Sequence, residues 1–216
     1  MAEFADKIEL PYFMVDGDYG FDQDKFLDPW MKLGGCGAVT ACDSCITLTL
    51  HKGLRLYPYG LSGPSVTKAE YVRFAKVMKP FLRPRHMGIN TLEIYMDGFL
   101  DYQKAVLGEV RLRMRGLPGS TAEKQAKTAL REQIDNGFPV PCLTLRHQDE
   151  QFEDYVWHWF LLTGYQQYRE QFFVKAVSYG EWKWFDFGAL WNTGHEERGG
   201  LVLFSQGHKT EWKENS

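Results

Sequence analysis

The sequence lacks the features of an exported or membrane-spanning chain. Its first residues, MAEFADKIELPYF, place Glu3, Asp6 and Glu9 among apolar residues. A secretory signal peptide instead begins with basic residues followed by an apolar run. No stretch approaches the roughly 20 consecutive apolar residues that a membrane-spanning helix needs. These absences predict a cytoplasmic protein with no membrane partner.

Cysteine is scarce, with four residues in a chain of 216. So few cysteines do not form the disulfide framework that is typical of small secreted domains. In a reducing compartment they are expected to be core residues, ligands or a nucleophile.

Positive charge is also in short supply. Lys and Arg number 25 against 28 Asp and Glu, and the formal net charge is −3. A nucleic-acid surface needs clustered positive charge, so we expect no nucleic-acid partner. The local exception is Arg111, Arg113 and Arg115, which alternate with apolar residues. We interpret them as the solvated face of a strand or extended segment, the alternative being a patch for an acidic partner.

The chain shows no internal repeat and no low-complexity segment. Its length fits one domain, and a chain of this size can bury a sufficient core without disulfides. We therefore expect a single domain over residues 1–216.

Helical patterns come first along the chain. The capping-box patterns Thr67-x-x-Glu70 and Ser120-x-x-Glu123 each predict a helix start, and Gly137 predicts a stop. The polar, turn-rich segments 16–29 and 53–66 are expected to be loops. Helices are predicted over about 36–50, 90–106 and 120–136. A further helix is predicted to start at Thr67, with an apolar face that extends to Phe81.

Strand patterns follow Gly137. Helices first and strands second is the signature of an α+β domain, here a helical part packed on an antiparallel sheet. The segments predicted as strands are PVPCLTLRH, WHWFLLTGY, QFFVKAVSYG, WKWFDF and GLVLFS.

Cys36 is the first candidate for chemistry because it lies where a Gly-Gly turn meets a predicted helix start. The N–H groups and dipole of a helix N-terminus stabilise a thiolate. Gly35 and Gly37 would let a substrate backbone approach closely. The alternative is a buried cysteine beside a structural glycine turn.

His158 is the second candidate. It opens the apolar strand HWFLLTG, between Trp157 and Trp159, which would keep it from bulk water. A neighbouring imidazole activates a thiol. The alternative is a core histidine satisfied by a backbone group.

These segments resemble a known family. GGCGAVTAC resembles the nucleophile segment of papain-like cysteine peptidases, and is closest to the bacterial branch that trims double-glycine leader peptides. GFPVPCLTL followed by HWFLLTGY resembles the strand pair of that branch. The resemblance covers about residues 20–50 and 130–190. It implies a papain-like α+β fold with Cys36 as nucleophile and His158 as its base.

The resemblance also implies two supporting residues. An Asn or Asp orients the histidine in the family, and hairpin geometry places Ser178 or its neighbours opposite His158. Ser178 can accept a hydrogen bond but carries no charge. Asp186 is the alternative third residue. The family's oxyanion-stabilising Gln would be Gln23, which is the only Gln upstream of Cys36.

A metal site is the rival interpretation. Cys42-x-x-Cys45 has ligand spacing. On a helix these two cysteines share a face and Cys36 points away from them, so we interpret them as small core residues and expect no metal. The remaining candidate ligands would be Cys36, Cys142, His147 and His158.

These residues support two possible functions. The first is thiol attack on an amide or acyl bond of a peptide or small amide substrate, without a cofactor. The second is a non-catalytic binding or scaffolding protein on the same fold. Ser178 in the third position favours the second function more than an Asn or Asp would.

Overall fold

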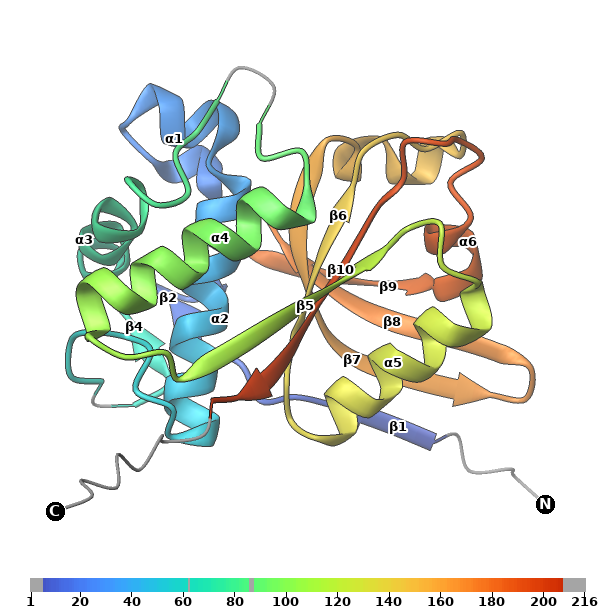
Figure 1. Cartoon of the computed structure of the whole chain (residues 1–216), viewed down its shortest axis with the longest axis horizontal. Coiled ribbons are helices and arrows are strands. Elements are labelled where there is room, and N and C mark those ends of the chain that lie inside the picture. The colour runs from blue at the N-terminus through green and yellow to red at the C-terminus, as the bar shows by residue number, and fades with distance from the viewer. Residues whose placement is uncertain (1–5, 62, 86–87, 208–216) are drawn as a thin grey trace, which may run out of the picture.

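The computed structural model describes residues 6–61, 63–85 and 88–207. The fold is mixed α+β, with an antiparallel sheet and helices, as predicted. The first four α-helices gather in one half of the molecule and the long strands in the other (Figure 1).

The helical half is built around one buried helix. Every residue of α2 from Cys36 to Leu48 is buried, so this helix lies at the centre of the helical half and has no solvent-exposed face over that range. Its last turn ends at Gly53, whose φ of 65° is the left-handed conformation that favours glycine. The helical elements here are α1 (Pro29–Gly34), α2 (Cys36–Lys52), α3 (Lys68–Met78), α4 (Leu92–Tyr102) and the π-helical η2 (Gln103–Leu107).

The main sheet has seven strands in the order β5-β10-β6-β7-β8-β9, and β1 pairs with the far end of β7. All of its pairings are antiparallel. Its strands are β1 (Asp6–Glu9), β5 (Leu112–Pro118), β6 (Val140–Thr144), β7 (His158–Tyr168), β8 (Gln171–Ser178), β9 (Glu181–Asp186) and β10 (Gly199–Gln206).

The sheet separates two hydrophobic cores. Trp159 and Leu161 of β7 pack into the core that contains α2, whereas Phe160 and Leu162 pack into the core on the other face. This alternation is the two-residue period of a strand buried on both sides. The second core is covered by α5 (Glu123–Asp135), the 3-10 helix η3 (Glu150–Tyr155) and α6 (Phe187–Trp191).

Several local predictions differ from the structure. The Thr67–Glu70 capping box forms, but α5 has Ala122 at its N-cap and no side-chain cap from Ser120. Two of the three arginines of the stripe, Arg113 and Arg115, lie exposed on β5, whereas Arg111 precedes the strand and is half-buried. The two segments expected to be loops contain short elements, namely β3 (Asp18–Tyr19), η1 (Gln23–Lys25), the start of α1 and β4 (Ser65–Val66), and β4 pairs with β2 (Met14–Val15).

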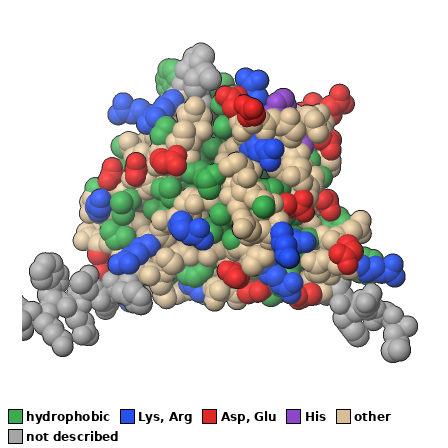
Figure 2. Space-filling model, turned by 45° about the vertical axis from the view of Figure 1, so that its right-hand side comes forward, with side chains coloured by type: hydrophobic (Ala, Val, Ile, Leu, Met, Phe, Trp, Pro, Cys, Tyr) green, Lys and Arg blue, Asp and Glu red, His purple; other side chains and the backbone are tan. Residues whose placement is uncertain are grey.

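Charged side chains of both signs are mixed on the face seen in Figure 2. Among the described residues, no helix combines the length and apolarity that crossing a membrane requires.

Candidate functional site

Cys36 is the first residue of α2, and the junction with α1 places it there. The Gly35 N–H donates to the Met31 carbonyl at 2.9 Å and closes α1, while the Gly35 carbonyl accepts from the Val39 N–H at 2.9 Å and opens α2. One residue therefore ends one helix and caps the next. A Cβ atom at Gly35 would overlap the Met31 carbonyl oxygen, so this junction requires glycine.

His158 begins β7, and Ser178 ends β8. The His158 Nε2 atom lies 2.7 Å from Ser178 Oγ, which is hydrogen-bond distance. The loop between β8 and β9 is Tyr179-Gly180, with φ of 54° and 75°, a two-residue hairpin turn with both central residues left-handed. This turn stacks the Tyr179 ring on the imidazole, with centroids 4.7 Å apart and planes 6° apart.

Gln23 lies in η1 and is buried. Its Nε2 donates to the Lys32 carbonyl of α1 at 3.2 Å. This bond ties η1 to α1 and brings the Gln23 side chain next to the start of α2.

Two hollows that share lining residues contain the predicted site residues. An open cleft of about 540 Å³ and an enclosed cavity of about 10 Å³ are both lined by Gln23, Cys36, His158 and Tyr179. Ser178 lines the inner cavity. The structure therefore brings the four predicted residues Gln23, Cys36, His158 and Ser178 together from η1, α2, β7 and β8.

Burial sets the charge state of the central pair. It raises the pKa of Cys36, against the lowering effect of the backbone N–H groups of Trp159, Gly37 and Cys36 itself. Burial also lowers the pKa of His158 to about 4. Both shifts favour the uncharged forms, so at neutral pH the resting pair is a thiol and a neutral imidazole.

Asp186 does not reach this site. It pairs with Phe173 near the far end of β8, and its carboxylate accepts from the Ala189 N–H at 2.9 Å as the N-cap of α6. Of the two alternatives for the third residue, Ser178 is the one beside His158.

The residues of the rival metal site are dispersed. Cys42 and Cys45 lie in the core around α2, whereas Cys142 lies in the core on the opposite face of the sheet. The Nε2 atom of His147 lies 3.0 Å from the Ala189 carbonyl oxygen. Over residues 6–61, 63–85 and 88–207, no group of three or more His, Cys, Asp or Glu side chains could hold a metal ion.

Sequence reasoning missed three polar residues that line the inner cavity, Thr40, Asp43 and Tyr179. Asp43 left a signal, because it is the only charged residue in the apolar run AVTACDSCITLTL. Tyr179 left none, since its position over the imidazole depends on the hairpin turn.

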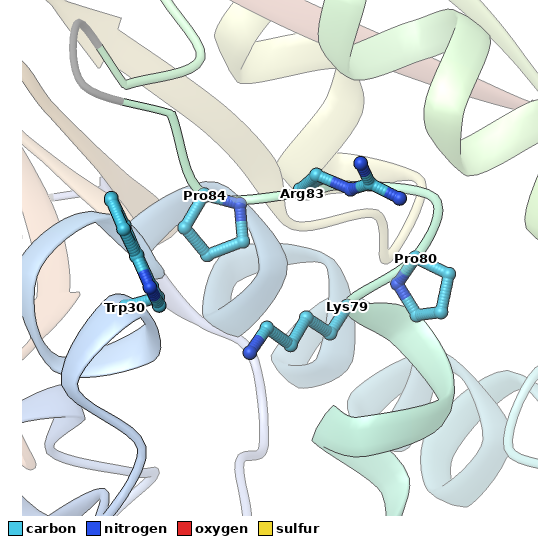
Figure 3. Close-up of a pocket in the computed structure, with 5 residues that line it drawn as sticks. All are labelled: Trp30, Lys79, Pro80, Arg83 and Pro84. Atoms are coloured by element: carbon cyan, nitrogen blue, oxygen red, sulfur yellow. The ribbon is translucent and has the colours of Figure 1, made fainter.

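A separate hollow of about 370 Å³ lies between α1 and the segment after α3. Figure 3 shows Trp30 and Pro80 on opposite sides, with the Lys79 side chain extending between them. None of the four predicted site residues lines it.

No protein-family model, curated protein or solved structure matches this chain.

Proposed function

We propose that this chain is a papain-like cysteine hydrolase that cleaves an amide or related acyl bond of a peptide or small amide, with Cys36 as nucleophile. One observation carries the proposal: Gln23, Cys36, His158 and Ser178, from four separate elements, line one cavity. A thiol, a base, a group that orients the base and a carboxamide donor are the parts that covalent acyl transfer needs.

The proposed reaction begins from the neutral pair. His158 takes the thiol proton as Cys36 Sγ bonds to the carbonyl carbon, and the resulting imidazolium gives that proton to the leaving amine as the C–N bond breaks. His158 then takes a proton from water as the water oxygen bonds to the thioester carbon. It returns that proton to Cys36 Sγ as the C–S bond breaks, which releases a carboxylic acid and regenerates the thiol and the neutral imidazole. Each step conserves atoms and charge within the pair and its substrate.

The developing oxyanion needs donors that are already in place. The Cys36 backbone N–H at the start of α2 and the Gln23 Nε2 group are assigned this role. Gln23 holds its side chain through the bond to the Lys32 carbonyl, so its amide is fixed before substrate arrives.

A second function, non-catalytic binding on the same fold, is favoured by one specific observation. Cys36 is only 6% exposed, and the cavity behind it has a volume of about 10 Å³. A scaffold that binds in the outer cleft would need no access to the thiol.

A cytoplasmic location belongs to the same proposal. It is supported by the four cysteines, all of which are free thiols, as expected in a reducing compartment.

The test is site-resolved alkylation with iodoacetamide, followed by mass spectrometry. At pH 7, Cys36 should react faster than Cys42, Cys45 and Cys142, because it alone lines a cavity together with the His158 base. His158→Ala should slow Cys36 alkylation about tenfold or more, since the imidazole assists loss of the thiol proton.

His147→Ala is the matched control, because this histidine lies outside the cavity and should leave the rate unchanged. An epoxysuccinyl probe that also labels Cys36 covalently would distinguish a hydrolase from a binding protein. Equal labelling of all four cysteines, or no effect of His158→Ala, would overturn the proposal.

A further inference from the structure

One face of α2 is polar where it meets the sheet. Cys36, Thr40 and Asp43 lie at positions i, i+4 and i+7, which places them on one side of a helix. All three are buried, and all three line the inner cavity with His158 and Ser178. A helix buried against a sheet normally presents apolar side chains there, so the burial of these polar residues needs an explanation.

Asp43 is held by two tyrosines from different parts of the chain. The Tyr12 hydroxyl donates to Oδ2 at 2.6 Å, and the Tyr71 hydroxyl donates to Oδ1 at 2.5 Å. A carboxylate can accept about four hydrogen bonds, so two acceptor positions remain after these donors. The carboxyl group is therefore fixed in place and still able to accept on the cavity side.

The cavity between Asp43 and Ser178 is the size of one water. Its volume of about 10 Å³ is close to the minimum of roughly 10–15 Å³ that a water molecule needs. Its polar walls offer the two to four partners that hold a buried water, among them the side chains of Thr40, Asp43 and Ser178.

We propose that Asp43 is a positioning residue for the His158 base, acting through one bound water and Ser178. The Ser178 hydroxyl donates to the water, the water donates to the Asp43 carboxylate, and Ser178 Oγ accepts from His158 Nε2–H. This chain of bonds fixes the proton on Nε2 and leaves Nδ1, which the Tyr179 hydroxyl approaches to 3.4 Å, unprotonated and able to take the Cys36 proton. A buried carboxylate thus supplies the negative charge that the Ser178 hydroxyl lacks. The inference rests on the proposed function.

The environment of Asp43 makes this role dependent on pH. Burial raises the pKa of Asp43 to about 7, although the two tyrosine hydroxyls lower it. The pKa of His158 is lowered to about 4 by burial, and that of Tyr179 is raised to about 12. The other titratable groups that face the carboxyl or the cavity have pKa values raised by burial, namely Tyr12, Tyr71, Tyr95, Cys42 and Cys36.

No Lys or Arg side chain lines the cavity in the described part of the chain. Among these groups, Asp43 alone changes charge between about pH 5 and 9. Ionisation of Asp43 favours the imidazolium form of His158. The rate of Cys36 alkylation should therefore increase in a step centred near pH 7, at lower pH than the main increase that follows ionisation of the thiol.

The experiment is the pH profile of Cys36 alkylation by iodoacetamide. Asp43→Asn should lower the rate at pH 8 about tenfold and remove the step near pH 7. Because Asp43 acts through Ser178, the double variant with Ser178→Ala should be no slower than the slower single variant. Asp135→Asn is the matched control, since Asp135 also accepts from a tyrosine, Tyr165, but lies outside the cavity.

Tyr71→Phe is a second variant that keeps the carboxyl and tests the same idea if Asp43→Asn does not fold. Loss of this donor raises the pKa of Asp43, so the step should move to higher pH. A step unchanged in Asp43→Asn or in Tyr71→Phe, or single-variant effects that multiply in the double variant, would overturn the inference. If His158→Ala also left alkylation unchanged, the proposed function would fail; if His158→Ala alone slowed it, only the role of Asp43 would fail.

Discussion

Gly35 shows how much of the candidate site depends on single atoms. It closes α1 and caps α2 through two backbone hydrogen bonds, and its φ of −84° is open to any residue. What excludes a side chain is the Met31 carbonyl, which occupies the position of a Cβ atom. The position of Cys36 therefore depends on the absence of a side chain at Gly35.

Gly35→Ala should destabilise the protein by about 1–3 kcal/mol, because the helix junction must shift to admit a methyl group. The same shift should slow Cys36 alkylation, since it moves the thiol relative to His158. Urea unfolding and iodoacetamide kinetics measure the two effects. Gly34→Ala is the control, because its Cβ would lie 3.4 Å from the nearest atom, the Arg85 carbonyl oxygen. Equal stability of the two variants would contradict this account of the junction.

At the scale of residues, the sequence identified groups whose possible role follows from their immediate neighbours in the chain. Cys36 beside glycines, His158 opening an apolar strand and Ser178 across a hairpin could each be found from local pattern. Asp43 could not be assigned to the site, because its distance from Ser178 depends on how α2 packs against two strands far along the chain.

At the scale of elements, the two predicted capping boxes show that a sequence pattern alone does not determine whether a cap forms. At α3, Thr67 Oγ1 accepts from the Glu70 N–H, and the Glu70 carboxylate accepts from the Thr67 N–H. At α5, the Glu123 carboxylate instead accepts from the Asn192 side chain at 2.7 Å, so it is not free to reach back along its own chain. Ser120 is left in an exposed turn.

Thr67→Ala should cost about 1 kcal/mol of unfolding free energy, because the Glu70 N–H loses its side-chain acceptor and the Glu70 carboxylate loses the bond from the Thr67 hydroxyl. Ser120→Ala should change that free energy by less than about 0.5 kcal/mol, as is usual for an exposed position without such contacts. Chemical denaturation of the two variants side by side provides the measurement. A larger loss from Ser120→Ala than from Thr67→Ala would refute this assignment of caps.

Long elements with a clear period were predictable, and short ones were not. The strands from β6 to β10 and helix α2 follow largely apolar segments, and α3 and α5 have apolar residues repeating along one face. α1 has six residues, and β2, β3 and β4 have two each, which is too short for a period to appear. These short elements are fixed by tertiary contacts, as in the bond from Gln23 to Lys32.

At the scale of the whole molecule, two buried groups give the folding free energy opposite responses to pH. The pKa of His158 falls from 6.5 to about 4 on folding, so the unfolded chain binds more protons in that window and stability is lost as pH falls through it. The pKa of Asp43 rises from 3.8 to about 7, so the native state binds more protons and stability is lost as pH rises. The two effects nearly cancel between about pH 4 and 6.5.

The combined contribution of these two groups to the unfolding free energy of the unaltered protein should therefore vary little across that window. Asp43→Asn should gain on the order of 3 kcal/mol as pH rises from 4 to 6.5, because only the His158 effect remains. His158→Gln should lose a similar amount over the same range. Urea titrations at several pH values test both signs, and parallel behaviour of the two variants would contradict the assignment.

β10 comes after β5 and β6 in the chain but lies between them in the sheet. During translation the Cys36 helix leaves the ribosome before β5 and β6. β6 can pair with β7 once both have emerged, but β5 pairs with β10 and cannot join the sheet until β10 follows it. The nascent chain thus carries the Cys36 thiol for an interval before β7 brings the His158 imidazole to it. If the thiol cleaves amide bonds, this order of synthesis delays that reactivity until β7 and β8 have emerged, and the position of β10 between β5 and β6 is the last of the sheet to be filled.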